Sequence, residues 1–241
     1  MINMIKKIEV WGDSVLKGII YDEKRNRYKR LEQNTAIEKI AELGLDVKNK
    51  TKFGMTAPKA KNLMLKELKK GIDTQMAIIE FGGNDCDFKW AEVAENPDGD
   101  HKPNTGLELF KNCIKDMVKA CRCYGITPVL MNLPPIHSVR YFNWISKGLN
   151  KNAILKWLVD IDVIYRHHET YNLAIMNLSK SLSCDLIDVR TPFLEKKDYY
   201  NYLCEDGIHP NEKGHILINQ IISDFMTKYR DIPSLTAIES I

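Results

Sequence analysis

Five short apolar runs, each followed by a stretch with helical spacing, constrain the fold of this chain more than any other feature. The runs are typical of buried β-strands and lie at residues 8–11, 45–47, 76–81, 127–133 and 185–189. The helical patterns lie at residues 35–43, 60–68, 107–124, 161–182 and 211–229. Strands that alternate with helices predict a parallel sheet covered by helices on both faces. We therefore predict an α/β fold, a three-layer α/β/α sandwich whose five-stranded parallel sheet has the flavodoxin-like order 2-1-3-4-5.

The length and composition indicate one globular domain. The chain has 241 residues, of which 44% are hydrophobic and 28% charged, as is usual for soluble globular proteins. No internal repeat or linker divides it, so we predict a single domain over residues 1–241. Two long segments follow the third and fourth strands, at about 86–106 and 134–158, and we interpret them as insertions that surround a site.

The charge pattern says little about partners. The net charge is +3, and the basic stretch at residues 24–30 is interpreted as a solvated helix or loop face, with attraction of an anionic substrate or surface as the alternative. No aromatic-plus-basic motif accompanies it, so we expect no nucleic-acid partner. No apolar run approaches the ~18–20 residues of a transmembrane helix. No pattern indicates an oligomeric state.

Polar and small residues follow the first three predicted strands. Ser14 follows the first, Gly54 the second and Asn84 the third. In the order 2-1-3 all three reach the carboxyl edge of the sheet, with Ser14 between the other two. The backbone N–H groups of Ser14 and Gly54 and the side-chain amide of Asn84 are therefore candidates to stabilise an oxyanion above Ser14.

A serine nucleophile needs a base, and residues 206–210 contain one. Asp206 and His209 lie three apart in a segment that Gly207 and Pro210 would turn sharply. Such a turn places the carboxylate against Nδ1 of the imidazole and leaves Nε2 facing Ser14. We predict a triad of Ser14, His209 and Asp206.

Four segments in this order resemble the sequence blocks of the SGNH/GDSL hydrolase family. They are GDS at 12–14, Gly54 in a short loop, GGND at 82–85 and DGIHPNEKGH at 206–215. The resemblance covers essentially the whole chain and implies an α/β/α sandwich, ester hydrolysis without a cofactor, and the roles given above to Ser14, Gly54, Asn84, Asp206 and His209. Val15 stands where leucine often follows the serine, which affects packing rather than chemistry.

Other constellations are less favoured. Asp13 would point away from Ser14 in an extended segment, so we expect it to hold its own loop by hydrogen bonds. Asp188 is expected to be structural. The spacing HExxH is absent, and we predict no metal. The GxSxG elbow of α/β-hydrolases is absent as well.

The predicted reaction is hydrolysis of a carboxylic ester through an acyl-enzyme on Ser14. An acyltransferase, or a thioesterase or lysophospholipase, would use the same site, and a non-catalytic binding module would be expected to lack one triad residue. The substrate is expected to be a small molecule with a short acyl group, with an acetylated carbohydrate as one candidate. Four aromatic residues in the two long segments would wall the pocket, unless they only cap the core beneath it: Phe88, Trp90, Tyr141 and Trp144.

The expected location is the cytoplasm. Only 13 residues precede Ser14, so removal of a secretory leader of 15–30 residues would remove the nucleophile. The six cysteines show no CxxC pair and no zinc-ligand spacing, which favours free thiols in a reducing compartment.

Overall fold

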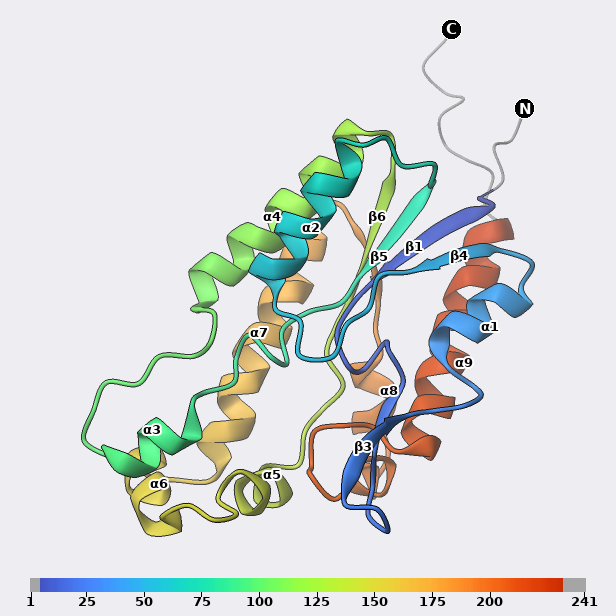
Figure 1. The fold of residues 1–241 in the computed structure, drawn as a ribbon. Helices are drawn as coiled ribbons and strands as arrows, with labels where there is room; N and C mark the ends of the chain where they lie inside the picture. The colour runs from blue at the N-terminus through green and yellow to red at the C-terminus, as the bar shows by residue number, and fades with distance from the viewer. Residues whose placement is uncertain (1–4, 232–241) are drawn as a thin grey trace, which may run out of the picture.

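A five-stranded parallel sheet forms the centre of the molecule (Figure 1). The structure is a computed structural model and describes residues 5–231, with the backbone alone for 228–231. The strands lie side by side in the order β4-β1-β5-β6-β7. Their bounds are β1 Lys7–Trp11, β4 Asp46–Asn49, β5 Met76–Ile79, β6 Thr127–Met131 and β7 Asp185–Ile187. Counted along the chain, these five strands have the predicted order 2-1-3-4-5, and the α/β prediction is confirmed.

Alternating strand residues supply the two hydrophobic cores. Ile8 and Val10 of β1 pack on one face of the sheet and Trp11 on the other, because successive side chains of a strand point to opposite faces. The first face is covered by α1 Ala36–Glu42, α8 Arg190–Leu194 and α9 Glu212–Asp231. The second face is covered by α2 Ala57–Leu68, α4 Leu107–Cys123 and α7 Asp162–Ser181 (Figure 1). The result is the predicted three-layer sandwich.

A β-hairpin is the next element of the chain after β1. Strands β2 Ile19–Asp22 and β3 Arg27–Arg30 pair antiparallel, with Tyr21 opposite Tyr28. The basic stretch at 24–30 is therefore the turn and second strand of this hairpin, so its interpretation as a helix or loop was wrong, whereas its cations are solvated as expected. Asn26 provides the positive φ of +50° in the turn, and alternation along β3 leaves Arg27 and Lys29 exposed while Tyr28 faces inward.

The two long segments after β5 and β6 contain short helices rather than open loops. They form α3 Trp90–Glu95, α5 Ser138–Ile145 and α6 Lys151–Leu158, and a short 3₁₀ helix Tyr199–Tyr202 precedes the loop before α9. Helices α3, α5 and α6 share a hydrophobic cluster with the start of α7, in which Val93, Phe142 and Ile154 are buried. This cluster lies at the carboxyl end of the sheet and provides a rigid wall beside it (Figure 1).

Candidate active site

Ser14 lies directly beyond the carboxyl end of β1, in a tight turn. The N–H of Ile19 donates to the carbonyl of Ser14 at 3.0 Å, and the N–H of Lys17 donates to the carbonyl of Asp13 at 3.1 Å. The residue is only 6% exposed, yet it borders a cavity. The turn therefore fixes the hydroxyl group at the edge of an enclosed space.

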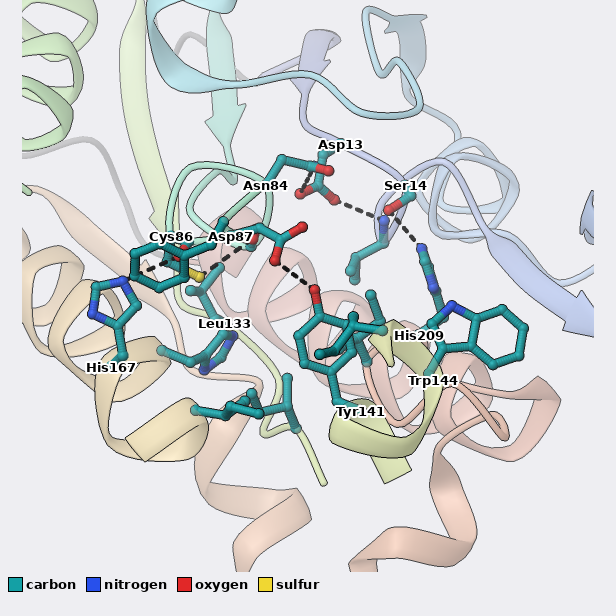
Figure 2. Close-up of a pocket in the computed structure, with 18 of the residues that line it drawn as sticks. Asp13, Ser14, Asn84, Cys86, Asp87, Leu133, Tyr141, Trp144, His167 and His209 are labelled. Carbon is teal, nitrogen blue, oxygen red and sulfur yellow. Dashed lines mark hydrogen bonds between the residues drawn. The ribbon is translucent and has the colours of Figure 1, made fainter. Parts of the chain in front are cut away.

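The loop before α9 brings Asp206 and His209 to Ser14. Nδ1 of His209 lies 2.6 Å from Oδ2 of Asp206. Nε2 of the same ring lies 2.9 Å from Oγ of Ser14 (Figure 2). Gly207 makes this approach possible, because it has a φ of +76° and a Cβ there would lie 2.7 Å from the backbone nitrogen of Tyr141. The structure therefore joins residues that are 195 positions apart in a continuous hydrogen-bonded chain.

The carboxylate in this chain is held in its charged form. Burial acts to raise the pKa of Asp206, but the hydrogen bond and charge of His209 and the N–H groups of Ile208 and His209 leave it below its ordinary value. Its Oδ1 accepts both N–H groups at 3.0 Å. An ionised Asp206 fixes the orientation of the imidazole ring and stabilises its positive charge when it takes up a proton.

Two aromatic residues that the sequence reasoning missed pack beside His209 and against each other. The Tyr28 ring lies 4.9 Å from the imidazole and the Phe53 ring lies 6.1 Å from it, the latter nearly parallel at 8°. The Tyr28 hydroxyl also donates to Oδ2 of Asp206 at 3.1 Å. The pair Tyr21 and Tyr28 on either side of a turn with Asn26 is the sequence signal that would have revealed this hairpin.

Asn84 borders the same cavity, but its amide group is engaged. Its Nδ2 donates to Oδ2 of Asp13 at 2.9 Å (Figure 2) and to the carbonyl of Met55 at 3.3 Å. Gly54 is not among the residues that line the cavity, whereas its neighbour Phe53 is. The structure thus brings Asn84 to the cavity that Ser14 lines but does not place Gly54 in its lining, and the oxyanion role of Gly54 stays a prediction.

Buried carboxyl groups support the loops around Ser14 and Asn84. Oδ1 of Asp13 accepts the N–H of Val15 at 2.8 Å, so Asp13 holds its own loop as predicted. Oε2 of Glu80 accepts the N–H of Asp13 at 3.3 Å, and burial raises the pKa of both groups. Asp85 accepts the N–H of Ala57 at the start of α2, and burial raises its pKa to about 7. These contacts tie the ends of β1 and β5 to α2.

Asp188 has the structural role that the sequence indicated. Its Oδ1 accepts the amide of Asn132 at 2.6 Å and the N–H groups of Arg190 and Thr191 at 3.1 Å. Its Oδ2 accepts the hydroxyl of Thr191 at 2.6 Å. Asp188 therefore caps the start of α8.

The cavity beside Ser14 has a volume of about 330 Å³ and runs from His209 towards α7. All four aromatic residues predicted to wall it do so: Phe88, Trp90, Tyr141 and Trp144. Trp157, Leu158, Val163 and Ile164 extend the apolar lining, whereas Phe142 packs in the core beneath. The site therefore combines a hydrogen-bonded serine with a small, mainly apolar and aromatic chamber.

Three further observations concern metal ions, cysteines and membrane helices. Within residues 5–231, no group of three or more His, Cys, Asp or Glu side chains is arranged to hold a metal ion. The six cysteines are free, and all except Cys123 are buried. Among the described helices, none combines the length and the apolar character needed to cross a bilayer.

Comparison with known proteins agrees with this fold. A lipoprotein of Bacillus subtilis named YqeF is 26% identical over 235 residues, which span 90% of this chain and 88% of that protein. The fold resembles a lipase/acylhydrolase from Enterococcus faecalis (TM-score 0.64, 16% identity, 93% of this chain and 97% of that one). It also resembles a carbohydrate acetylesterase from Sinorhizobium meliloti (TM-score 0.62, 13% identity, 93% and 99%). The sequence profile of the GDSL-like lipase/acylhydrolase family matches residues 10–217. With that match over most of its length, this chain belongs to the GDSL-like lipase/acylhydrolase family.

Proposed function

We propose that this protein is a serine esterase that hydrolyses carboxylic esters through an acyl-enzyme on Ser14. The observation that carries the proposal is the unbroken chain of hydrogen bonds from Asp206 through His209 to Ser14 at the wall of a cavity. A serine hydroxyl is a weak nucleophile by itself and reacts when a neighbouring base removes its proton.

In the first half of the reaction, Oγ of Ser14 attacks the ester carbonyl carbon while its proton passes to Nε2 of His209. The carbonyl oxygen becomes an oxyanion, for which we propose Nδ2 of Asn84 and the N–H groups of Ser14 and Gly54 as donors. The longer of the two Asn84 bonds, the 3.3 Å contact with the Met55 carbonyl, is the one that exchanges for the oxyanion. The imidazolium then gives its proton to the leaving alkoxide, and the ester C–O bond breaks.

In the second half, water replaces the alcohol. His209 takes a proton from the water, whose oxygen attacks the acyl carbon, and the collapse of the second intermediate returns the proton to Oγ of Ser14. Tyr28 and Phe53 pack beside the imidazole ring, and the Tyr28 hydroxyl helps to fix Asp206. Asp206 stays ionised and keeps Nδ1 of His209 protonated.

The direct test is reaction with a fluorophosphonate probe together with an arylesterase assay. We expect one equivalent of probe to bind to Ser14 and to abolish turnover of p-nitrophenyl acetate. Mass spectrometry of the labelled peptide identifies the residue. A protein that neither reacts with the probe nor turns over any ester would refute the esterase function.

The pH dependence should follow the protonation of the catalytic base. Activity is expected to rise with pH, because only a neutral imidazole accepts the serine proton. Asp206 has a lowered pKa and stays ionised in the active enzyme, so its own protonation does not set this rise. A kcat/KM profile for p-nitrophenyl acetate measures this, and activity that is highest in acid would contradict it.

We propose short acyl esters as substrates, acetyl to butyryl. A cavity of about 330 Å³ is at the small end for ligand sites, and bulky rings wall it. The kcat/KM for p-nitrophenyl esters of two to sixteen carbons is expected to peak by four carbons. A steady climb past eight carbons would instead favour a lipase or thioesterase.

We also propose a cytoplasmic location. Free thiols persist most readily in a reducing compartment, and all six cysteines are free. The location stays a prediction, since the Bacillus subtilis relative is named a lipoprotein. Fractionation of cells that express the full-length protein tests it, with recovery in the membrane fraction as the contrary result.

A further inference from the structure

A carboxylate that the ester chemistry does not use lies in the wall of the cavity. Asp87 follows the Asn84 loop, and its Oδ1 accepts the Tyr141 hydroxyl at 2.5 Å and Nε1 of Trp90 at 2.8 Å. In Figure 2 the other carboxylate oxygen points into the space between Tyr141 and Ser14. The two side-chain donors thus occupy one oxygen and leave the second turned towards a ligand.

Ionisation of the Asp87 carboxylate is costly in the wall of this cavity. Burial acts to raise the pKa of Asp87, while the bonds from Tyr141 and Trp90 and the Phe88 N–H favour its charged form. Side chains around it are mostly apolar or aromatic, so hydrogen bonds to the carboxylate matter for its charged form. A ligand hydroxyl group would donate one more such bond to the oxygen that Tyr141 and Trp90 leave.

The size of the cavity limits what such a ligand can be. At about 330 Å³ the cavity lies at the small end of the range for ligand pockets. A short acyl group fills only part of it, which leaves room for part of the alcohol. The rings of Phe88, Trp144 and Trp157 line this room and offer flat apolar surfaces to the C–H face of a sugar ring.

We propose that Asp87 is a specificity-determining residue whose carboxylate accepts a hydrogen bond from a hydroxyl group of the alcohol part of the substrate. The substrate class is an acetyl-type ester of a polyhydroxylated alcohol about the size of one sugar ring. This inference rests on the esterase function proposed above and adds to it the recognition of the alcohol.

The first experiment needs no substitution. The wild-type kcat/KM is compared between the methyl 6-O-acetyl glycosides of glucose, galactose and mannose and cyclohexylmethyl acetate, a primary acetate on a ring of similar size without hydroxyl groups. We expect at least one glycoside to be preferred by about 10- to 100-fold, as a hydrogen bond to a charged group provides. Monodeoxy analogues of that glycoside should identify one hydroxyl whose removal abolishes the preference.

The second experiment assigns the preference to Asp87. Asp87→Asn keeps an oxygen for Tyr141 and Trp90 but turns an NH₂ group, or a weaker neutral acceptor, towards the ligand. We expect the ratio of kcat/KM for the glycoside to that for cyclohexylmethyl acetate to fall by about 10- to 100-fold. Asp98→Asn is the matched control, because Asp98 is an exposed carboxylate paired with Lys156, and its ratio should stay at the wild-type value.

The outcomes separate this inference from the esterase function itself. Turnover of p-nitrophenyl acetate without any preference for a glycoside, or a preference that Asp87→Asn retains, overturns the role of Asp87 alone. The role of Asp87 is also overturned if Asp87→Asn changes kcat/KM only for esters with a hydroxyl group on the acyl part, such as 3-hydroxybutyryl esters. Absence of both turnover and fluorophosphonate labelling removes the esterase function first.

Discussion

Ser14→Ala is expected to reduce ester turnover by several orders of magnitude while the protein keeps its fold. Loss of a triad nucleophile in serine hydrolases costs up to about 10⁶-fold in kcat, because no other group forms the acyl-enzyme. Ser14 Oγ has His209 as its hydrogen-bond partner, and the alanine would retain the backbone of the turn. The measurement is kcat for p-nitrophenyl acetate, with the melting temperature as the check on folding.

Ser181→Ala provides the matched control for this substitution. Ser181 lies at the end of α7, is exposed, and bonds only the backbone carbonyl of Leu178 in its own helix. Its activity should equal that of the wild type. If Ser14→Ala retained more than about 1% of the wild-type kcat, a nucleophile other than Ser14 would have to be sought.

Asn84→Ala should lower kcat by about 10²- to 10³-fold, the usual loss when one oxyanion donor is deleted. KM should change much less, since the donor acts on the charge that develops in the transition state. Steady-state kinetics with p-nitrophenyl acetate separate the two constants. The amide is already held by Asp13 at 2.9 Å, so it is preorganised for this task.

Other changes in kcat, KM or melting temperature in Asn84→Ala would give Asn84 a role other than oxyanion donor. A raised KM with an intact kcat would make Asn84 a binding residue. A parallel loss of kcat and melting temperature would point to the Asp13 loop, whose contact with Asn84 the substitution removes. Circular dichroism during thermal unfolding distinguishes these cases.

Much of the fold was predictable because its signals are local. Residues 8–11 and 76–81 are apolar runs of strand length, and the glycines that end the neighbouring helices mark their bounds. The edge rule for parallel sheets then placed Ser14 and Asn84 at one end. The loop from Asp206 to His209 could be interpreted because the glycine and proline that shape it lie within the same five residues.

Two features were missed for different reasons. The hairpin has a local signal, the pair Tyr21 and Tyr28 around Asn26, but the charges at 24–30 concealed its second strand. Phe53 and Tyr28 meet His209 only when three separate segments have packed, and no local pattern specifies that meeting.

The bond between Ser14 and His209 also has a consequence for how the protein is made. During synthesis the N-terminal strand leaves the ribosome first, whereas the loop with the base emerges almost 200 residues later. On the proposed function, a nascent chain carries an inert serine until all five strands of the sheet have been made. Esterase activity would then report completed folding, and its recovery on dilution from denaturant should coincide with the return of the near-UV signal of the four tryptophans.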